Sequence, residues 1–425
     1  MDPRAIIQES LDYIEENLKA DLTVSELAEQ AGYSHFHYYR LFQTSTGMSV
    51  MAYVQRRRLL HGIYAIAMGS TKTDAALCYG FDTYAGFYRA FQREFGVTPS
   101  DYLRSRKASR PHRLNLEKEE HMIVTHKKAA EILKHWGLEQ EPISDICYEN
   151  GTPNSNAFYV GSRYILKHTA NLGKLRSHAA LSHSLAEIGL WAAAPIPTAD
   201  GREYVADGEL YFTLTSRFPG KQLSPAGLYG DMQNARFVGE IIGQLHLALS
   251  RCDACVREAD LLETVTFWAL PRTAEALNLS PGFCHKYLDT FRQLYPQLPR
   301  QIIHRDPNPG NILRSEEAWG FIDFELSERN VRIYDPCYAA AAVLSESFGR
   351  DNEGWIAIYQ NILLGYDSVA KLTLAERQAV PYVLLANQLV CTAWFAEQDE
   401  YQNLFSINKA MTLWLIDNFH RLSVE

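Results

Sequence analysis

Three polar side chains within residues 302–325 have the types and the spacing needed for phosphoryl transfer. Asp306 follows an apolar run and His304, Asn311 comes five residues later, and Asp323 ends the next apolar run. A His-x-Asp loop, an Asn five residues on and a strand that ends in Asp are typical of sites that hold metal-bound ATP beside a hydroxyl. We expect Asp306 to orient the hydroxyl and accept its proton, and Asn311 and Asp323 to bind Mg²⁺. The alternative is a polar loop beside an ordinary hairpin, in which Asp306 forms a turn and Asp323 caps a strand.

Strands upstream of this motif would have to hold the phosphates of the nucleotide. Residues 146–169 read as a strand, a polar turn at 150–156 and two further strands, Ala157–Val160 and Tyr164–His168. Lys167, near the end of the last strand, would pair with the α and β phosphates of ATP. The alternative is a solvated lysine at a strand end.

A later apolar strand predicts the segment that would meet the adenine. This strand runs into Thr213–Gly220, which has the Pro and Gly of a chain reversal. We expect it to be the hinge of a two-lobe fold, with backbone groups near Ser216 and Phe218 facing the base. The predicted cofactors are therefore ATP and Mg²⁺.

Residues from about 123 to 425 resemble the aminoglycoside phosphotransferase and choline kinase superfamily. The resemblance rests on the residues named above and on Gly239–His246, which is similar to a helix that ends in Leu-His. It implies a two-lobe kinase fold, ATP with magnesium, and a small hydroxylated acceptor. The implied lobes are about 123–218 and about 219–425.

Two positions depart from the pattern of that superfamily. Arg305 stands between the His and the Asp, where Gly or Asn is usual. The glutamate that should pair with the strand lysine falls near His178, and Glu187 lies almost three turns later on the same helix. The second departure leaves open a kinase fold that binds its ligand without turning it over.

The first hundred residues contain an internal repeat of two helix-turn-helix units. A helix at Ile6–Leu18 precedes the first unit, which has a capped helix and a Gly-containing turn at Leu22–Ser34 and a helix at Ser34–Ser45. The pattern recurs about 48 residues later, with Thr73–Asp82 and a helix at Thr83–Phe95. Such a repeat indicates an all-α domain built from two similar units.

This region resembles the DNA-binding domain of the AraC/XylS family of transcriptional regulators over essentially its full length. The motifs that carry the resemblance are Ala31–Ser34, Arg40–Phe42, Gly47, Tyr53–Leu59, Gly80–Phe87, Arg89–Phe91, Phe95–Pro99 and Tyr102. It implies that the second helix of each unit enters a major groove, and that a linker helix around Met51–Met68 spaces the two by about one turn of DNA. The side chains implied to face base edges are Phe36, Tyr39, Arg40, Tyr84, Ala85, Tyr88 and Arg89. Arg40 and Arg89 would contact guanine or, alternatively, backbone phosphates.

Other residues of this region have plainer interpretations. Phe42, Phe87, Phe91 and Phe95 have helical spacing and are expected in the core. The run Arg56–Arg58 would ordinarily be a solvated helix face. Beside two recognition helices, we expect at least one of these arginines to contact a phosphate.

Charge and composition agree with two parts of different character. The chain has 425 residues, 47% of them hydrophobic, and a net charge of −9. Residues 1–110 carry 13 Lys and Arg against 12 Asp and Glu, whereas the remainder carries 28 against 38, so the acidity belongs to the second part. The seven cysteines are scattered, and neither a signal peptide nor an apolar run of membrane length is apparent. We therefore expect a cytoplasmic protein with no membrane partner.

The sequence predicts a multidomain protein, with an all-α double helix-turn-helix DNA-binding domain at 1–105, a linker at 106–122 that buries little, and an α+β two-lobe protein-kinase-like domain at 123–425. The preferred hypothesis is a sequence-specific transcriptional regulator whose kinase domain phosphorylates or senses a small hydroxylated metabolite or antibiotic. The alternatives are a metabolic or resistance phosphotransferase with an accessory DNA-binding domain, and a regulator whose kinase fold is inactive and senses ligand. The predicted partners are promoter DNA and a small-molecule acceptor or effector, with RNA polymerase as a further candidate.

Overall fold

The computed structural model describes residues 3–105, 110–117, 122–147, 153–187, 189–397 and 402–423. The chain divides into two compact units, which are Met1–Leu175 with Pro195–Arg217, and Arg176–Ala194 with Phe218–Glu425. Parts of the expected linker and of the expected turn at 150–156 lie outside the described residues, which omit 106–109, 118–121 and 148–152.

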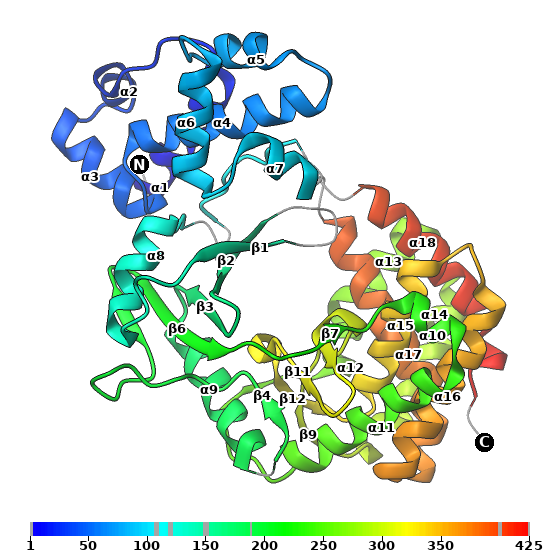
Figure 1. Ribbon diagram of the computed structural model, residues 1–425. Helices are drawn as coiled ribbons and strands as arrows, with labels where there is room; N and C mark the ends of the chain where they lie inside the picture. Colours follow the sequence, from blue (N-terminus) through cyan, green and yellow to red (C-terminus); the bar gives the residue numbers. More distant parts are fainter. Residues whose placement is uncertain are drawn as a thin grey trace. The chain divides into compact units, whose positions relative to one another are not determined.

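The N-terminal part of the first unit is helical throughout the described residues 3–105 (Figure 1). Its helices are α1 (Pro3–Glu16), α2 (Val24–Gln30), α3 (His35–Thr46), α4 (Val50–Ala67), α5 (Lys72–Cys78), α6 (Tyr84–Phe95) and α7 (Pro99–Ser105). Four of these helices begin at a side chain that accepts a backbone N–H three residues later, which stabilises the first turn. These caps are Thr23, Ser34, Thr71 and Thr83. The predicted pair of helix-turn-helix units is therefore confirmed.

Each helix-turn-helix unit has its own apolar core, and the long helix α4 contributes to both. The first core contains Tyr38 and Phe42 of α3 beside residues of α1 and the start of α4. The second core contains three phenylalanines of α6 beside the later part of α4, and these are Phe87, Phe91 and Phe95. The expectation that Phe42 and these three side chains are core residues is confirmed.

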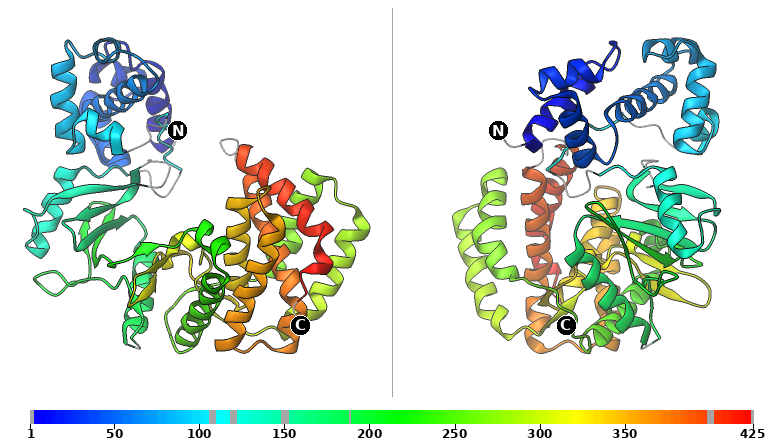
Figure 2. Two further views of the ribbon diagram at one scale, coloured as in Figure 1. Left: turned by 45° about the vertical axis from the view of Figure 1, so that its right-hand side comes forward. Right: turned by 90° about the vertical axis from the view of Figure 1, so that its left-hand side faces the viewer.

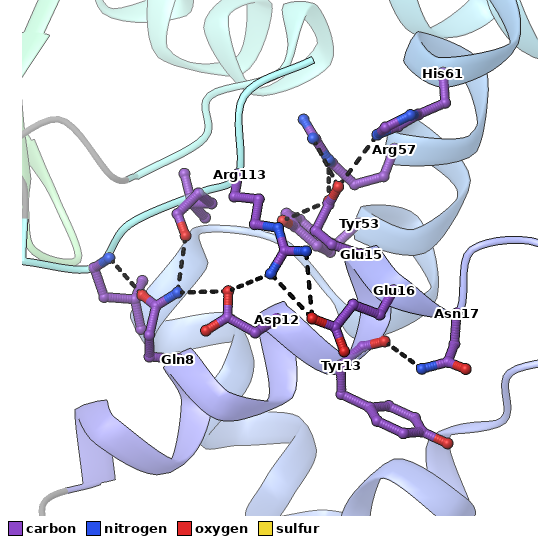
Figure 3. A network of polar contacts seen from close by, with 12 residues as sticks. Gln8, Asp12, Tyr13, Glu15, Glu16, Asn17, Tyr53, Arg57, His61 and Arg113 are labelled. Carbon is purple, nitrogen blue, oxygen red and sulfur yellow. Dashed lines mark hydrogen bonds and ion pairs between the residues drawn. The ribbon is translucent and has the colours of Figure 1, made fainter. Parts of the chain in front are cut away.

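Residues 110–117, which the sequence assigns to a linker, pack on α1 (Figure 3). The amide of Gln8 donates to the carbonyl oxygen of Leu114 at 3.0 Å and accepts from the backbone N–H of Leu116 at 2.9 Å. Arg113 lies 3.3 Å from the carboxylate of Glu16. Leu116 is only 4% exposed and belongs to the first core. The expectation that this stretch buries little is wrong for Leu116.

The remainder of the first unit is an antiparallel sheet with a helix packed on it (Figure 1 and Figure 2). The sheet order is β1-β2-β3-β6-β5, and its core includes Phe158, Leu166 and Phe212. The elements are α8 (His126–Leu133), η1 (Lys134–Trp136), β1 (Ile143–Cys147), β2 (Pro153–Val160), β3 (Tyr164–Thr169), β5 (Val205–Asp207) and β6 (Leu210–Ser216). The three predicted strands are present, although β2 begins at Pro153, within the stretch expected to be turn.

The second unit contains two small sheets and a group of long helices. One sheet has the order β4-β11-β10-β7 and the other β8-β12-β9. Their strands are β4 (Trp191–Ala192), β7 (Lys221–Gln222), β8 (Arg257–Glu258), β9 (Arg300–Ile303), β10 (Ile312–Arg314), β11 (Trp319–Phe321) and β12 (Glu328–Val331). Helix α9 (Leu172–Glu187) begins in the first unit and continues into the second.

The second unit is rich in long helices (Figure 2). These helices pack around one large core, in which Trp355 is fully buried. They are α10 (Pro225–Gly230), α11 (Met232–Leu249), α12 (Leu261–Thr264), the π-helix η2 (Val265–Ala269), α13 (Leu270–Leu277), α14 (Pro281–Leu294), α15 (Tyr334–Ser347), α16 (Asn352–Val369), α17 (Leu374–Ala396) and α18 (Gln402–Asp417). The 3₁₀ turns are η3 (Tyr295–Gln297), η4 (Pro309–Asn311), η5 (Phe324–Leu326) and η7 (Phe419–Arg421).

Helices α11 and α16 pack so closely that glycine is required between them. A Cβ atom on Gly239 would lie 1.9 Å from the carbonyl oxygen of Ile362, which is inside van der Waals contact. This packing places His246, near the end of α11, in the core. Among the described residues, α17 is the helix long and apolar enough to cross a membrane by length and composition, yet 67% of its apolar window is buried in the unit.

Candidate active site and nucleic-acid interface

The loop that carries Asp306 is held by a buried carboxylate from a distant part of the chain. Asp335, in the first turn of α15, accepts the backbone N–H of His304 at 2.8 Å and that of Arg305 at 2.9 Å. The imidazole of His304 is within 2.9 Å of the carbonyl oxygen of Ile322. Arg305 has a left-handed backbone with φ of 72°, which is unfavourable for a side chain of this size. The two hydrogen bonds to Asp335 therefore fix a strained turn immediately before Asp306.

Asp306 lies among hydrogen-bond donors from its own loop. Its carboxylate accepts from the amides of Asn308 at 2.8 Å and Asn311 at 3.1 Å. Burial raises the pKa of the Asp306 carboxyl above its usual value, and the neighbouring charge of Asp323 adds to the rise. Hydrogen bonds from Asn308 and Tyr338 oppose it. A partly buried carboxylate with a raised pKa accepts a proton more readily than an exposed one.

Asn311 precedes β10 and Asp323 follows β11, so both residues lie at the open end of one hairpin. Strands β10 and β11 pair Ile312 with Phe321, and the backbone N–H of Ile322 donates to the carbonyl oxygen of Asn311 at 3.0 Å. The amide nitrogen of Asn311 also donates to the main-chain oxygen of Asp306 at 2.9 Å, which leaves its side-chain oxygen as the acceptor end. The structure thus brings together the three residues predicted from the motif.

The side chains available for a metal at this hairpin are an amide oxygen and a carboxylate. Among the described residues, His, Cys, Asp and Glu form no group of three or more that could bind a metal. Mg²⁺ needs few protein ligands, because it keeps several waters and takes further oxygens from substrate phosphates. Asn311 and Asp323 therefore fit Mg²⁺ bound to a nucleotide, and they do not form a metal site made by protein alone.

A buried hydrogen-bond chain behind the loop was not predicted from the sequence. His246 contacts the carboxylate of Asp335 at 2.8 Å through Nε2 and the hydroxyl of Tyr366 at 2.8 Å through Nδ1. His246 is 1% exposed and Asp335 is fully buried. The Leu-His ending of the helix was the available signal for His246. Asp335 had no such signal, because an Asp-Pro pair at a helix start resembles an ordinary cap.

The unusual Arg305 is paired with a buried glutamate. Its guanidinium lies 3.1 Å from the carboxylate of Glu328, which is 2% exposed. Arg257 and Asn330 also contact Glu328. The departure from the superfamily's pattern is therefore compensated locally, by an ion pair beside the strained turn.

The residues predicted to bind the nucleotide belong to both units. In the first unit, Lys167 is half-buried in the middle of the sheet, where β3 places it between Ala157 and Thr213. Ser216 ends β6 in the same sheet. Phe218, in the second unit, is buried against Trp191 with their ring centroids 4.8 Å apart.

The helix position expected to carry a glutamate is occupied by a histidine in a local contact. His178 of α9 lies 3.3 Å from the carbonyl oxygen of Ala193, and its ring is near Phe324. Glu187, at the last turn of the same helix, is exposed.

The predicted DNA-facing residues of the first helix-turn-helix unit share the outer face of α3. Phe36 is 74% exposed, and Tyr39 and Arg40 are exposed beside it. Tyr38 and Phe42, on the opposite face, are fully buried. An exposed aromatic ring and an arginine on one helix face suit contact with bases and phosphates.

The second helix-turn-helix unit repeats this arrangement on α6 with one difference. Ala85 and Arg89 are exposed, whereas Tyr84 and Tyr88 are half-buried. Tyr84 stacks on Phe87 with ring centroids 5.9 Å apart, and burial raises the pKa of its hydroxyl. Part of the Tyr84 ring is thus used for packing, and the residue stays partly accessible.

The arginines of the run Arg56–Arg58 all have partners within the domain. Arg57 is 7% exposed and forms an ion pair with Glu15, a carboxylate that also contacts His61 (Figure 3). Arg56 pairs with Glu94, and Arg58 donates to carbonyl oxygens that follow α1. Arg57 is therefore not part of a solvated helix face. Phosphate contact by at least one of the three arginines stays a prediction, for which the half-buried Arg56 and Arg58 are the candidates.

The fold and these sites define a protein in which a DNA-binding helix-turn-helix domain is joined to a small-molecule kinase fold. A model of a helix-turn-helix domain matches residues 27–105, and a model of a phosphotransferase enzyme family matches residues 149–372, more than half of the chain. The chain belongs to this phosphotransferase enzyme family and carries an N-terminal helix-turn-helix domain of the AraC type.

Curated relatives match the N-terminal region. The right origin-binding protein of Escherichia coli strain K12 is 38% identical over 106 residues, which are 25% of this chain and 37% of that protein. The chain thus spans little more than a third of that relative. The regulatory protein SoxS of Salmonella typhimurium is 34% identical over 105 residues, which are 24% of this chain and 96% of SoxS.

Solved structures match the C-terminal region at the level of the fold. An amicoumacin kinase in complex with AMP-PNP, Ca²⁺ and Ami has a TM-score of 0.52 at 17% identity, over 69% of this chain and 91% of that one. A microcompartment-associated aminopropanol kinase has a TM-score of 0.51 at 15% identity, over 69% of this chain and 97% of that one.

Proposed function

We propose that this protein is a sequence-specific transcriptional regulator whose C-terminal domain is an active ATP-dependent phosphotransferase with a small hydroxylated acceptor. The observation that carries the proposal is the hydrogen-bonded loop in which Asp306, Asn311 and Asp323 come together on a buried support. The proposed domain limits remain 1–105, a joining segment at 106–122, and 123–425.

Asp306 has the proposed role of general base. Its carboxylate orients the acceptor hydroxyl and receives its proton as the phosphoryl group is transferred. The raised pKa of Asp306 favours the proton transfer, and the amides of Asn308 and Asn311 fix the direction of the carboxylate. Mg²⁺, bound through Asn311 and Asp323, would neutralise charge on the phosphates.

Residues of both units have proposed roles in nucleotide binding. The amine of Lys167 pairs with the α and β phosphates. Backbone groups near Ser216 and Phe218 hydrogen-bond the adenine. These assignments are supported by the central place of Lys167 in the sheet and by the end of β6 at Ser216.

The recognition surface consists of the exposed faces of α3 and α6. Phe36, Tyr39 and Arg40 face one major groove. The matching set in the second groove is Tyr84, Ala85, Tyr88 and Arg89. RNA polymerase would be a partner at the promoter. A protein that uses DNA and ATP together would work in the cytoplasm.

The first experiment measures ATP consumption by the full chain with Mg²⁺ across aminoglycosides, amino alcohols and hydroxy amino acids. Turnover that needs both an acceptor and Asp306, and that is lost in Asp306→Asn, supports the phosphotransferase. Tight ATP binding without turnover for every acceptor would instead favour a second candidate function, a regulator whose kinase fold only senses ligand. The histidine at position 178, in place of the superfamily's glutamate, is the observation that favours this candidate.

The second experiment separates a regulator from a kinase with an accessory DNA-binding domain. Arg40→Ala with Arg89→Ala should abolish regulated transcription and weaken binding to a selected duplex, with ATP turnover unchanged. The matched control is Arg202→Ala, because Arg202 is an exposed arginine of the sheet-bearing part paired with Asp200. Regulation that persists in the double variant would favour the accessory role.

A further inference from the structure

The two recognition helices end in the same way, and their ends contact residues that lie close together in a later segment of the chain. Both α3 and α6 stop at a glycine in the left-handed region, Gly47 with φ of 78° and Gly96 with φ of 69°. Each glycine lies against residues that follow the expected linker, within the first unit.

The end of α3 is bonded to Ile123 through the main chain. The backbone N–H of Ile123 donates to the carbonyl oxygen of Thr46 at 2.9 Å. A Cβ atom on Gly47 would lie 2.7 Å from the carbonyl oxygen of Ile123, so the contact admits only glycine. Thr46 is itself fixed, because it is fully buried and its hydroxyl donates to the carbonyl oxygen of Phe42.

The end of α6 lies against His126, the first residue of α8. A Cβ atom on Gly96 would lie 3.3 Å from Nδ1 of His126. The other ring nitrogen contacts the carboxylate of Asp145 in β1 at 2.7 Å, and the ring meets Phe158 of β2 edge-on. His126 therefore connects the second recognition helix to the sheet that carries Lys167.

Successive residues of the segment Met122–Val124 pack with two different cores. Ile123 packs with the core of the first helix-turn-helix unit, whereas Met122 and Val124 pack with the core of the sheet. Successive side chains of an extended segment point to opposite sides, which allows three residues to join two cores. The preceding stretch at 110–117 is also held on α1 by Gln8 (Figure 3).

We propose that the segment Met122–His126 holds the C-terminal ends of both recognition helices on the sheet β1-β2-β3-β6-β5. The segment would thereby link nucleotide binding by the kinase domain to DNA binding. The linkage rests on the proposed function, since it assumes that the kinase domain binds a nucleotide. A movement of the sheet would change the spacing of α3 and α6, which two successive major grooves require to be about one turn of DNA. By reciprocity, DNA binding must then change nucleotide affinity by the same factor.

The test compares two glycine substitutions that differ in their surroundings. Gly47→Ala introduces both a left-handed alanine and a clash with Ile123. Gly69→Ala introduces a left-handed alanine with φ of 101°, but none of the described atoms lies within 4 Å of the new Cβ. Amide hydrogen exchange at Ile123 should be roughly tenfold faster in Gly47→Ala than in the wild type or in Gly69→Ala, because the bond to Thr46 is lost.

The linkage itself is measured with the full chain and a duplex selected by it from a random pool. Its affinity for the duplex should change at least about fivefold between no nucleotide and AMP-PNP with Mg²⁺. In Gly47→Ala the ratio of duplex affinities with and without AMP-PNP should approach one, and in Gly69→Ala it should equal that of the wild type. If Gly47→Ala does not fold, His126→Ala takes its place, with the exposed His135→Ala as its control.

Two outcomes are distinguishable. Tight AMP-PNP binding with unchanged duplex affinity in the wild type would refute the linkage and leave the proposed phosphotransferase intact. Absence of AMP-PNP binding would count against the proposed function. The role of the segment is then tested through the effect of bound DNA on amide exchange. The duplex should slow exchange at Ile123 and in α8 of the wild type, and unchanged exchange there would refute the segment's role.

Discussion

Asp335→Asn should separate the support of the catalytic loop from its chemistry. The wild-type carboxylate accepts from the backbone N–H groups of His304 and Arg305 and contacts His246, all within 2.9 Å. An amide of the same shape keeps one oxygen, so its best orientation retains His304 and His246 and turns its NH₂ group toward the N–H of Arg305. One buried donor is then left unpaired, at a cost of about 1–3 kcal/mol.

The two surviving hydrogen bonds also lose the charge of their acceptor, which weakens each by about 1 kcal/mol. The lower desolvation of a neutral side chain offsets part of this loss. We therefore expect the free energy of unfolding of the second unit to fall by roughly 3 to 4 kcal/mol. Because Arg305 loses the partner that holds its left-handed backbone, Asp306 should shift, and ATP turnover should fall about 100-fold.

The assay is urea unfolding, together with amide exchange at His304 and Arg305 and ATP turnover of the full chain. The control is Asp351→Asn, because Asp351 caps α16 at the surface and Asn caps helices equally well. Exchange at Arg305 should accelerate in Asp335→Asn and stay unchanged in the control. The reasoning fails if Asp335→Asn unfolds within about 0.5 kcal/mol of the wild type and keeps its turnover.

Three further changes have defined outcomes. The pKa of Glu15 is lowered from 4.5, because hydrogen bonds from His61 and Arg57 outweigh the effect of its burial. The contribution of Glu15 to stability is therefore complete above pH about 5 and is lost as the pH falls through the lowered pKa. Urea midpoints should fall more steeply below pH about 5 in the wild type than in Glu15→Gln. Leu116→Ala should destabilise the first unit by about 2–4 kcal/mol in urea unfolding, because it removes a buried side chain. Glu117→Ala, at an exposed position, should leave the stability unchanged. Equal urea midpoints for the two variants would show that residues 110–117 are not part of the core. Asn311→Ala should raise the Mg²⁺ concentration for half-maximal ATP turnover roughly tenfold or more, a result that an unchanged magnesium titration would contradict.

Much of the N-terminal domain could be predicted because its signals are local. Helix caps act within three residues, and helical periodicity separates buried from exposed faces within one helix. The burial of Phe42 and the exposure of Arg40 follow from their positions on α3 alone. The ion pairs of the arginine run were not predicted, because the partners Glu15 and Glu94 lie about 40 residues away along the chain. Such pairs depend on how helices pack, which periodicity does not report.

The candidate active site shows the same division. Asp306, Asn311 and Asp323 were predictable because one loop and one hairpin carry all three within 18 residues. Their support was not predictable, because His246 and Asp335 meet across 89 residues of sequence. The pairing of Arg305 with Glu328 likewise depends on the register of β12 with β9.

The sequence by itself determined that this chain joins an AraC-type helix-turn-helix domain to a phosphotransferase-family fold, and it predicted the loop that carries the candidate catalytic residues. Those features are carried by residue types at short spacing, which a linear chain displays directly. Tertiary structure alone decided that Leu116 and Ile123 pack with the core of the first helix-turn-helix unit, and that α3 and α6 end against Ile123 and His126. A polar, charged stretch looks like a linker when read alone. Whether its few apolar residues are buried depends on the complementary surfaces that the folded domains present to it.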